Sequence, residues 1–260
     1  MLLKDRVAII TGAGSGIGQG VALRFAREGA KLALVDIRSE ALEETAAQLH
    51  NTGAEFDTYT GDVSVSADVE GFFGAAVQRF GRIDIAVNNA GIGNPVAPLH
   101  MMPDDGFDQT IAVNLRGVFL CMRAAAQQMI KQGGGGRIIS VSSQAGKTGF
   151  PMLGPYCATK AGVILMTQTM AKEVGTFKIN VNCVCPGTID TPLLRGALEP
   201  ILNAAGQTLE EWALKNMPTI PLGRIGYPTD VAKVITFLAS DDGDYMTGQA
   251  INITGGQEMH

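Results

Sequence analysis

Short apolar runs alternate with longer amphipathic segments along nearly the whole chain of 260 residues. Runs rich in aliphatic, β-branched or aromatic side chains predict strands at residues 6–11, 31–36, 55–63, 83–88, 137–142, 179–185 and 250–253. Apolar residues at helical spacing predict helices at 16–28, 39–51, 66–80, 155–174 and 228–238. A further long helix is expected to end near residue 131.

Several of these strands are apolar at consecutive positions, which is typical of a sheet covered by helices on both faces. Repeated strand–helix units predict parallel strands with right-handed crossovers. We therefore predict one α/β domain over residues 1–260, built on a doubly wound, Rossmann-type, mostly parallel sheet of seven strands. The four glycines at 133–136 form a turn that is too short to be a domain linker.

Composition and charge exclude several classes of protein. Hydrophobic residues make up 46% of the chain and charged residues 17%, which suits a large core. The net charge is −5 and basic residues occur singly or in pairs, so we expect no nucleic-acid partner and no membrane surface. Without a signal-like or membrane-spanning apolar segment, the protein is expected to be soluble and cytoplasmic. Cys183 and Cys185 are interpreted as small buried strand residues, and no metal site is predicted.

A glycine-rich turn follows the first predicted strand. Its sequence, Thr-Gly-Ala-Gly-Ser-Gly-Ile-Gly over residues 11–18, leads directly into a predicted helix. Glycines allow the backbone to turn sharply and to approach a pyrophosphate, while the helix amino terminus offers free N–H groups. The turn therefore predicts a dinucleotide site.

Asp36 ends the second predicted strand, 18 residues beyond Gly18. A carboxylate at this place binds ribose hydroxyls and repels a 2′-phosphate, so NAD is favoured over NADP. Arg38 is the one nearby group that could accept a 2′-phosphate. Asp36 has a second interpretation, as a helix N-cap or a solvated strand end.

Six motifs in order then resemble the short-chain dehydrogenase/reductase family across essentially the whole chain. They are the glycine turn, Asn88-Asn89-Ala90-Gly91, Asn114, Ser143 with Tyr156 after it, Tyr156-Cys157-Ala158-Thr159-Lys160, and Cys185-Pro186-Gly187-Thr188. The resemblance implies a nicotinamide cofactor and catalytic roles for four residues: Asn114, Ser143, Tyr156 and Lys160. The cofactor site that it implies contains Gly12, Ser15, Gly16, Ile17, Gly18, Asp36, Asp62, Val63, Asn89, Ala90, Gly91, Tyr156, Lys160, Pro186, Gly187, Thr188 and Ile189.

Tyr156 is the candidate acid/base for an alcohol proton. A free tyrosine has a pKa of about 10, too high for a base near neutral pH. Lys160 lies four residues later on the same helix face, so its ammonium is expected to lower the pKa of the phenol. By the resemblance, Ser143 would steady the substrate oxygen, and Asn114 would hold a water that connects Lys160 to solvent.

Substrate specificity is expected in residues 92–103, 144–155 and 188–218, the last of which resembles a lid over the cleft. Ser143, Gln144 and Tyr156 are the candidate substrate contacts. Gln144 could bind a second hydroxyl, so a sugar alcohol or a vicinal diol is the predicted small-molecule substrate. Two alternatives are a 3-oxoacyl thioester reductase that uses NADPH and a protein that senses NAD without turnover.

The predicted helix at 155–174 contains the apolar run Val163-Ile164-Leu165-Met166. Four consecutive apolar residues cover most of a helix's circumference, and the sheet can bury one side alone. A subunit interface would cover the rest. We therefore expect a homo-oligomer, and the family resemblance points to a dimer or a tetramer.

Overall fold

The computed structural model describes residues 1–260, apart from the side chains of Ile201, Ala204, Leu209 and Asn216. In this described chain seven strands form one sheet in the order β3-β2-β1-β4-β5-β6-β7, and every neighbouring pair is parallel. The strands are β1 (Val7–Thr11), β2 (Lys31–Asp36), β3 (Phe56–Thr60), β4 (Ile85–Asn88), β5 (Gly136–Val141), β6 (Ile179–Pro186) and β7 (Ala250–Ile253). The predicted doubly wound α/β fold is confirmed, with a sheet that is parallel throughout.

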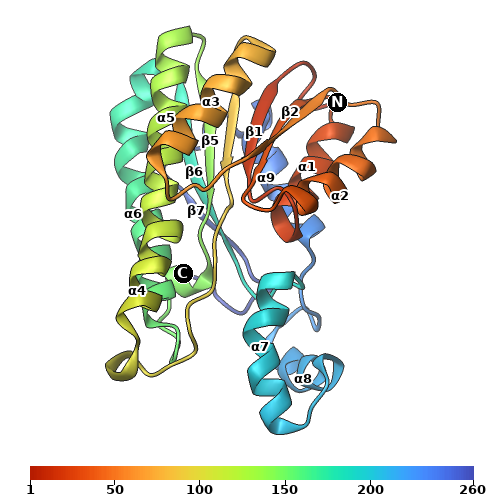
Figure 1. The fold of residues 1–260 in the computed structure, drawn as a ribbon, viewed down its shortest axis with the longest axis vertical. Coiled ribbons are helices and arrows are strands. Elements are labelled where there is room, and N and C mark those ends of the chain that lie inside the picture. Colours follow the sequence, from red (N-terminus) through yellow and green to blue (C-terminus); the bar gives the residue numbers. More distant parts are fainter.

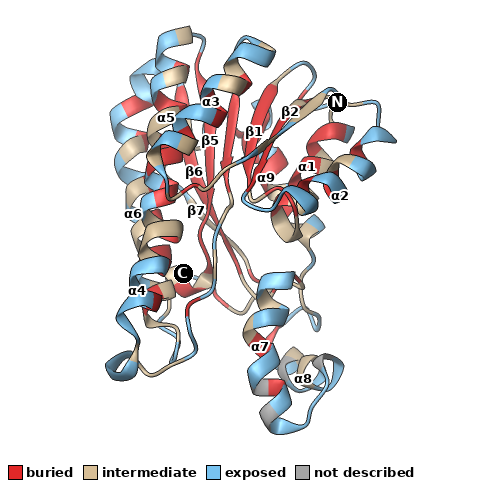
Figure 2. Cartoon of the chain, viewed as in Figure 1, coloured by how far each residue is buried: buried red, intermediate tan, exposed pale blue. Residues whose placement is uncertain are grey.

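Helices cover both faces of this sheet (Figure 1). One layer contains α1 (Gly16–Arg27), α2 (Ser39–His50) and α9 (Pro228–Ala239); the other contains α3 (Ser66–Phe80), α5 (Val118–Gln132) and α6 (Gly154–Val174). Ala8 and Ile10 pack in the first core, whereas Ile9 between them packs in the second. Every residue of the central strands β1, β4 and β5 is therefore buried (Figure 2), which explains their uninterrupted apolar runs.

The predicted long helix before residue 131 is interrupted. It consists of α4 (Asp104–Ile111), a π-helical segment η2 (Ala112–Gly117) and α5. A π-helical turn inside an α-helix often marks a functional site, and Asn114 lies within this one. Short turns of 3₁₀-helix complete the described elements: η1 (Leu99–Met101), η3 (Gln144–Gly146), η4 (Gly175–Phe177), η5 (Met217–Thr219) and η6 (Asp241–Gly243).

Two helices project beyond the carboxyl end of the sheet, α7 (Pro192–Ala205) and α8 (Leu209–Asn216) (Figure 1). Thr191 caps α7 by accepting a hydrogen bond from the N–H of Leu194 at 3.2 Å. A capping box between Thr208 and Glu211 begins α8. The stretch predicted as a lid is therefore a pair of short, individually capped helices.

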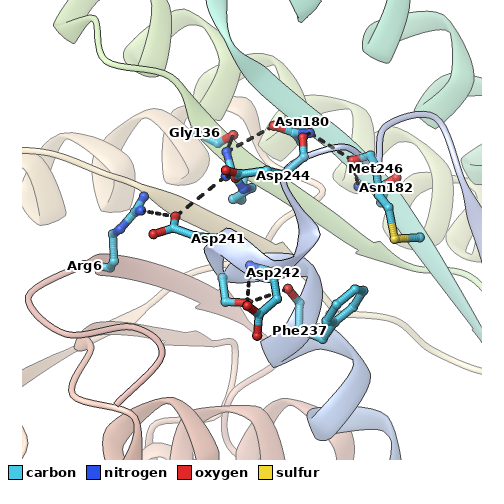
Figure 3. A network of polar contacts seen from close by, with 11 residues as sticks. Arg6, Gly136, Asn180, Asn182, Phe237, Asp241, Asp242, Asp244 and Met246 are labelled. Carbon is cyan, nitrogen blue, oxygen red and sulfur yellow. Dashed lines mark hydrogen bonds and ion pairs between the residues drawn. The ribbon is translucent and has the colours of Figure 1, made fainter.

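The opposite, amino end of the sheet is tied by polar side chains (Figure 3). Arg137, at the start of β5, donates to Asn180 of β6 at 3.1 Å and forms an ion pair with Asp244 beyond η6. Asn180 in turn donates to the carbonyl of Met246 at 2.9 Å, and Arg6 pairs with Asp241 at 2.6 Å. This network stabilises the end of the sheet that lies away from the cleft.

No described helix is both long enough and apolar enough to cross a membrane.

Candidate active site

The glycine turn between β1 and α1 opens onto a cavity of about 500 Å³ at the carboxyl end of the sheet. Gly12 and Gly16 adopt positive φ angles of 64° and 55°, a region that favours glycine. The first turn of α1 has no side-chain cap among the described residues, so its N–H groups are available to an anion. Most predicted cofactor residues of the amino-terminal half line this cavity: Gly12, Ser15, Gly16, Ile17, Asp36, Asp62, Val63, Asn89, Ala90 and Gly91.

Gly18 does not line either cavity described here, and its place in the site is structural. A Cβ atom at Gly18 would lie 2.0 Å from the carbonyl oxygen of Gly12 and 2.6 Å from the side-chain nitrogen of Asn89. Asn89 itself donates to the carbonyls of Thr11 and Gly12, both at 3.0 Å. Gly18 therefore lets α1 pack directly on the turn, which fixes the shape of the cradle.

Asp36 lies at the rim of the same cavity with 7% of its surface exposed. Its carboxylate accepts from the N–H of Gly14 at 3.0 Å and from the N–H of Arg38 at 3.1 Å. The Arg38 guanidinium lies 3.7 Å from Asp36 and donates to the Ser15 hydroxyl at 3.1 Å. The carboxylate keeps lone pairs for ribose hydroxyls, while Arg38 is partly neutralised by Asp36.

The residues present therefore fit an adenine dinucleotide. The cavity combines a glycine cradle that a Cβ would fill, free N–H groups at a helix terminus and an acidic group at the ribose position. Within the described part of the chain, no cluster of three His, Cys, Asp or Glu residues could hold a metal ion.

A second cavity, of about 250 Å³, adjoins the first, and five residues line both: Ile17, Asn89, Gly91, Thr191 and Leu193. The later predicted residues gather here: Ser143, Gln144, Tyr156, Lys160, Pro186, Gly187, Thr188 and Ile189. The wall also contains residues that the sequence did not single out, namely Asn94, Phe150 and Leu153. They belong to the segments 92–103 and 144–155, where specificity was expected.

Ser143, Tyr156 and Lys160 converge on this cavity. Ser143 caps η3, where its hydroxyl accepts from the N–H of Ala145 at 3.1 Å, and it forms a side-chain hydrogen bond with Tyr156. Lys160 is 4% exposed; its ammonium donates to the carbonyl of Val141 at 2.8 Å and lies 5.5 Å from the centre of the Tyr156 ring. The predicted spacing on α6 does place both side chains on one face.

Asn114 faces Lys160 across Gly91. Its side-chain amide forms two hydrogen bonds of 2.8 Å with the backbone N–H and carbonyl of Ile92, which hold it rigidly. A Cβ at Gly91 would lie 3.2 Å from the Asn114 oxygen and 3.6 Å from the Lys160 nitrogen. A side chain at Gly91 would therefore crowd the Asn114 amide, and glycine keeps the space beside these two polar groups open.

Burial has the largest effect on the pKa values of Tyr156 and Lys160, and one expectation about Tyr156 is wrong. Burial raises the pKa of the Tyr156 phenol, and the hydrogen bond with Ser143 offsets this rise in part. The expected net fall in this pKa is not found in the ligand-free protein, because burial outweighs the lowering contributions. Burial lowers the pKa of Lys160 to about 8, against an ordinary value of 10.5. The low dielectric of the site thus acts on both groups.

Three comparisons place the chain among known proteins. Residues 12–258 match a family model described as enoyl-(acyl carrier protein) reductase. The chain is 42% identical to the 3-oxoacyl-acyl-carrier-protein reductase FabG of Thermotoga maritima, over 98% of this chain and 99% of that protein. It is 39% identical to levodione reductase of Leifsonia aquatica, over 97% of this chain and 94% of that protein.

Solved structures agree with these sequence relations. A crystal structure of levodione reductase superposes with a TM-score of 0.94 at 38% identity, covering 98% of both chains. A 3-ketoacyl-(acyl-carrier-protein) reductase from Brucella melitensis, complexed with NADH, gives a TM-score of 0.87 at 34% identity, covering 99% of this chain and 100% of that chain. Both likenesses extend over the sheet, the cradle and the projecting helices.

Proposed function

The chain belongs to the short-chain dehydrogenase/reductase family and is an oxidoreductase that interconverts secondary alcohols and ketones; we propose that its cofactor is NAD and that Tyr156 is its acid/base. The observation that carries the proposal is the convergence of Ser143, Tyr156 and Lys160 on a cavity that adjoins the glycine cradle. Bound NAD would supply the hydride acceptor, and NADH the hydride donor. The chain's own residues would bind the substrate and move its proton.

Tyr156 would exchange a proton with the substrate oxygen while Ser143 donates a hydrogen bond to that same oxygen. In ketone reduction the neutral phenol, favoured by burial, is the form that donates a proton. Lys160, still largely protonated at neutral pH, would stabilise the phenolate that remains. A water near Asn114 would connect Lys160 to solvent and return the proton, as the relation to the family implies.

Three features near the ribose position support NAD. The Asp36 carboxylate lies at the cavity rim, Ser15 supplies no positive charge in the turn, and Arg38 is already engaged by both residues. A 2′-phosphate would meet the Asp36 charge at close range, and like charges repel strongly where water is scarce. Arg38 is the group that would soften this repulsion.

The substrate cavity supports a vicinal diol or hydroxyketone that carries an apolar remainder. Its wall is formed largely by Phe150, Leu153, Ile189, Leu193 and Leu194. Gln144, beside Ser143, offers one further polar contact for a second oxygen. A sugar alcohol with a hydroxyl on every carbon would leave most of its polar groups against this apolar wall, at a desolvation cost.

A 3-oxoacyl thioester reductase is the second candidate, favoured by the relation to FabG and by the same apolar wall. Initial rates with NAD⁺ and NADP⁺ across 2,3-butanediol, a pentitol, a hexitol and a 3-hydroxyacyl thioester separate the two. Turnover of NAD⁺ with the diol supports the proposal. Preference for NADP⁺ with the thioester contradicts it, and cofactor binding without any turnover would favour a sensing role.

We further propose that residues 188–218 act as a substrate lid and that the protein is a homo-oligomer. Leu193 and Leu194 of α7 line the substrate cavity, so movement of α7 would open or close it. On α6, Val163 is buried in the core whereas Leu165 is 64% exposed. An apolar side chain so exposed on a long helix is suited to a subunit interface.

A further inference from the structure

The carboxy-terminal residues 255–258 lie against both ends of the proposed lid. The N–H of Leu222, just beyond the lid, donates to the carbonyl of Gly255 at 3.1 Å. The side chain of Gln257 reaches Thr188 at the start of the lid and Thr219 immediately after it. Two positions 31 residues apart in sequence are therefore joined through one side chain of the tail.

The oxygen of the Gln257 carboxamide bonds to one end of the lid and its nitrogen to the other. Its oxygen accepts from the Thr188 hydroxyl at 3.1 Å and from the N–H of Thr188 at 3.4 Å. Its nitrogen donates to the Thr219 hydroxyl at 3.2 Å. An amide supplies an acceptor and two donors in one planar group, so this one side chain can accept from Thr188 and donate to Thr219 at the same time.

Gly187 makes room for this contact. A Cβ there would lie 3.1 Å from the Gln257 oxygen, 3.1 Å from the Gln144 oxygen and 2.9 Å from the Cα of Thr254. Any side chain at Gly187 would thus push the tail away from Thr188. The absence of a side chain at Gly187 therefore allows the tail to pack beside Thr188.

Gln257 acts on the direction of the Thr188 hydroxyl more than on the position of its backbone. The carbonyl of Thr188 is already held by the N–H of Gly226 at 2.9 Å. Because the hydroxyl has a single proton and gives it to Gln257, its lone pairs stay available to a donor in the cavity. Thr188 lines the substrate cavity, which adjoins the dinucleotide cavity. The carboxamide NH₂ of a nicotinamide bound there would be such a donor.

We propose that Gln257 is a positioning residue, which clasps the two ends of the lid and orients the Thr188 hydroxyl toward the nicotinamide carboxamide. The second part rests on the proposed function, because it requires a nicotinamide cofactor in this cavity. The first part concerns the lid alone and can be measured on the ligand-free protein.

Three variants test the proposal: Gln257→Ala, Thr219→Val and, as a control in the tail, Met259→Ala. The Met259 side chain is 78% exposed. Binding of NADH and of ADP-ribose is measured by titration, together with KM for NAD⁺ and kcat. Gln257→Ala should raise the NADH dissociation constant and KM for NAD⁺ about three- to tenfold, the worth of one oriented hydrogen bond. ADP-ribose, which lacks nicotinamide, should bind unchanged.

Thr219→Val separates the two roles. It leaves the Gln257 oxygen as an acceptor for Thr188, so its affinity for NADH should stay near that of the wild type. It removes the hydroxyl that accepts from Gln257, so trypsin should cleave the ligand-free lid at Arg195 and Lys215 faster. Adding Thr219→Val to Gln257→Ala should accelerate cleavage no further than Gln257→Ala alone, since both remove the same bond.

NADH affinity in Gln257→Ala equal to that of Met259→Ala would overturn the orienting role. An equal loss of NADH and ADP-ribose affinity would also overturn it, because that pattern indicates general damage. Lid cleavage unchanged in Gln257→Ala and Thr219→Val would overturn the clasp. Absence of NADH binding by the wild type would instead contradict the proposed cofactor, and with it the role of Thr188, while the cleavage comparison would still decide the clasp.

Discussion

At the scale of single residues, the proposed preference for NAD is a prediction about Asp36 and Arg38 at the rim of the cavity. Asp36→Ala removes the carboxylate and frees the guanidinium that it holds at 3.7 Å. Hydrogen bonds to a charged group contribute about 1.5–3 kcal/mol, so KM for NAD⁺ should rise about ten- to a hundredfold. KM for NADP⁺ should fall. Initial rates with both cofactors measure this, and the double variant with Arg38→Ala should lose the NADP⁺ gain.

Lys160 gives a second residue-scale prediction, on stability. Its pKa is about 8 in the folded protein and 10.5 for an ordinary lysine, so between these values the unfolded chain binds more protons. The free energy of unfolding should therefore contain a contribution that rises with pH across this window and is lost as pH falls toward 8. One pKa unit corresponds to about 1.4 kcal/mol, giving a rise on the order of 3 kcal/mol.

Lys160→Met keeps the side-chain bulk without the charge, and urea unfolding of both proteins at several pH values isolates the contribution. The difference in unfolding free energy between variant and wild type should shrink as pH rises from about 8 to 10. A constant difference would show that the lysine is not destabilised by burial.

At the scale of elements, the packing of α1 on the glycine turn depends on Gly18. Gly18→Ala places a methyl group 2.0 Å from the Gly12 carbonyl, so the helix or the turn must move. We expect a loss of about 1–3 kcal/mol in stability and a large loss of NADH affinity. Gly71→Ala is the matched control, because Gly71 lies inside α3 with no atom within 4 Å of its Cβ position.

Gly71→Ala should leave binding unchanged and stabilise α3 by about 0.5–1 kcal/mol. Thermal unfolding and NADH titration of the two alanine variants decide the matter. If both variants bind NADH like the wild type, the close approach at Gly18 is not what shapes the cradle.

At the scale of elements, some features of the site could be predicted from the sequence and others could not. The glycine turn, Asp36 and the Tyr156–Lys160 pair were found because their chemistry lies within a few residues of one strand or helix. The π-helical turn at Asn114 was not foreseen, since one shifted hydrogen bond leaves the apolar period almost unchanged. The raised pKa of Tyr156 was missed because spacing reveals a neighbouring charge but not how deeply a site is buried.

At the scale of the whole molecule, chemistry is concentrated at the carboxyl end of the sheet and the polar ties of Arg137 at the amino end. The order of the strands and their parallel pairing follow from repeated strand–helix units, so the fold was predictable. The role of Gln257 was not predictable, because this residue contacts Thr188 from 69 positions away in the sequence and belongs to no motif. Contacts between a tail and a lid are set by tertiary structure alone.

The assembly is a whole-molecule prediction. The exposed Leu165 on α6 should lie in a subunit interface, so light scattering coupled to gel filtration should give the mass of a dimer or tetramer for the wild type. Leu165→Glu, which places a charge in that interface, should give a smaller assembly. A monomeric wild type, or a variant of unchanged mass, would contradict this interface.

In the proposed reaction Tyr156 moves the proton while NAD exchanges the hydride. The most direct test follows NADH formation from NAD⁺ and the best alcohol of the panel with wild type and Tyr156→Phe, alongside NADH titration of both. We expect kcat to fall ~10²–10⁴-fold in the variant, the usual worth of a general acid/base, while NADH affinity changes less than about threefold. Turnover by Tyr156→Phe near the wild-type rate would contradict it.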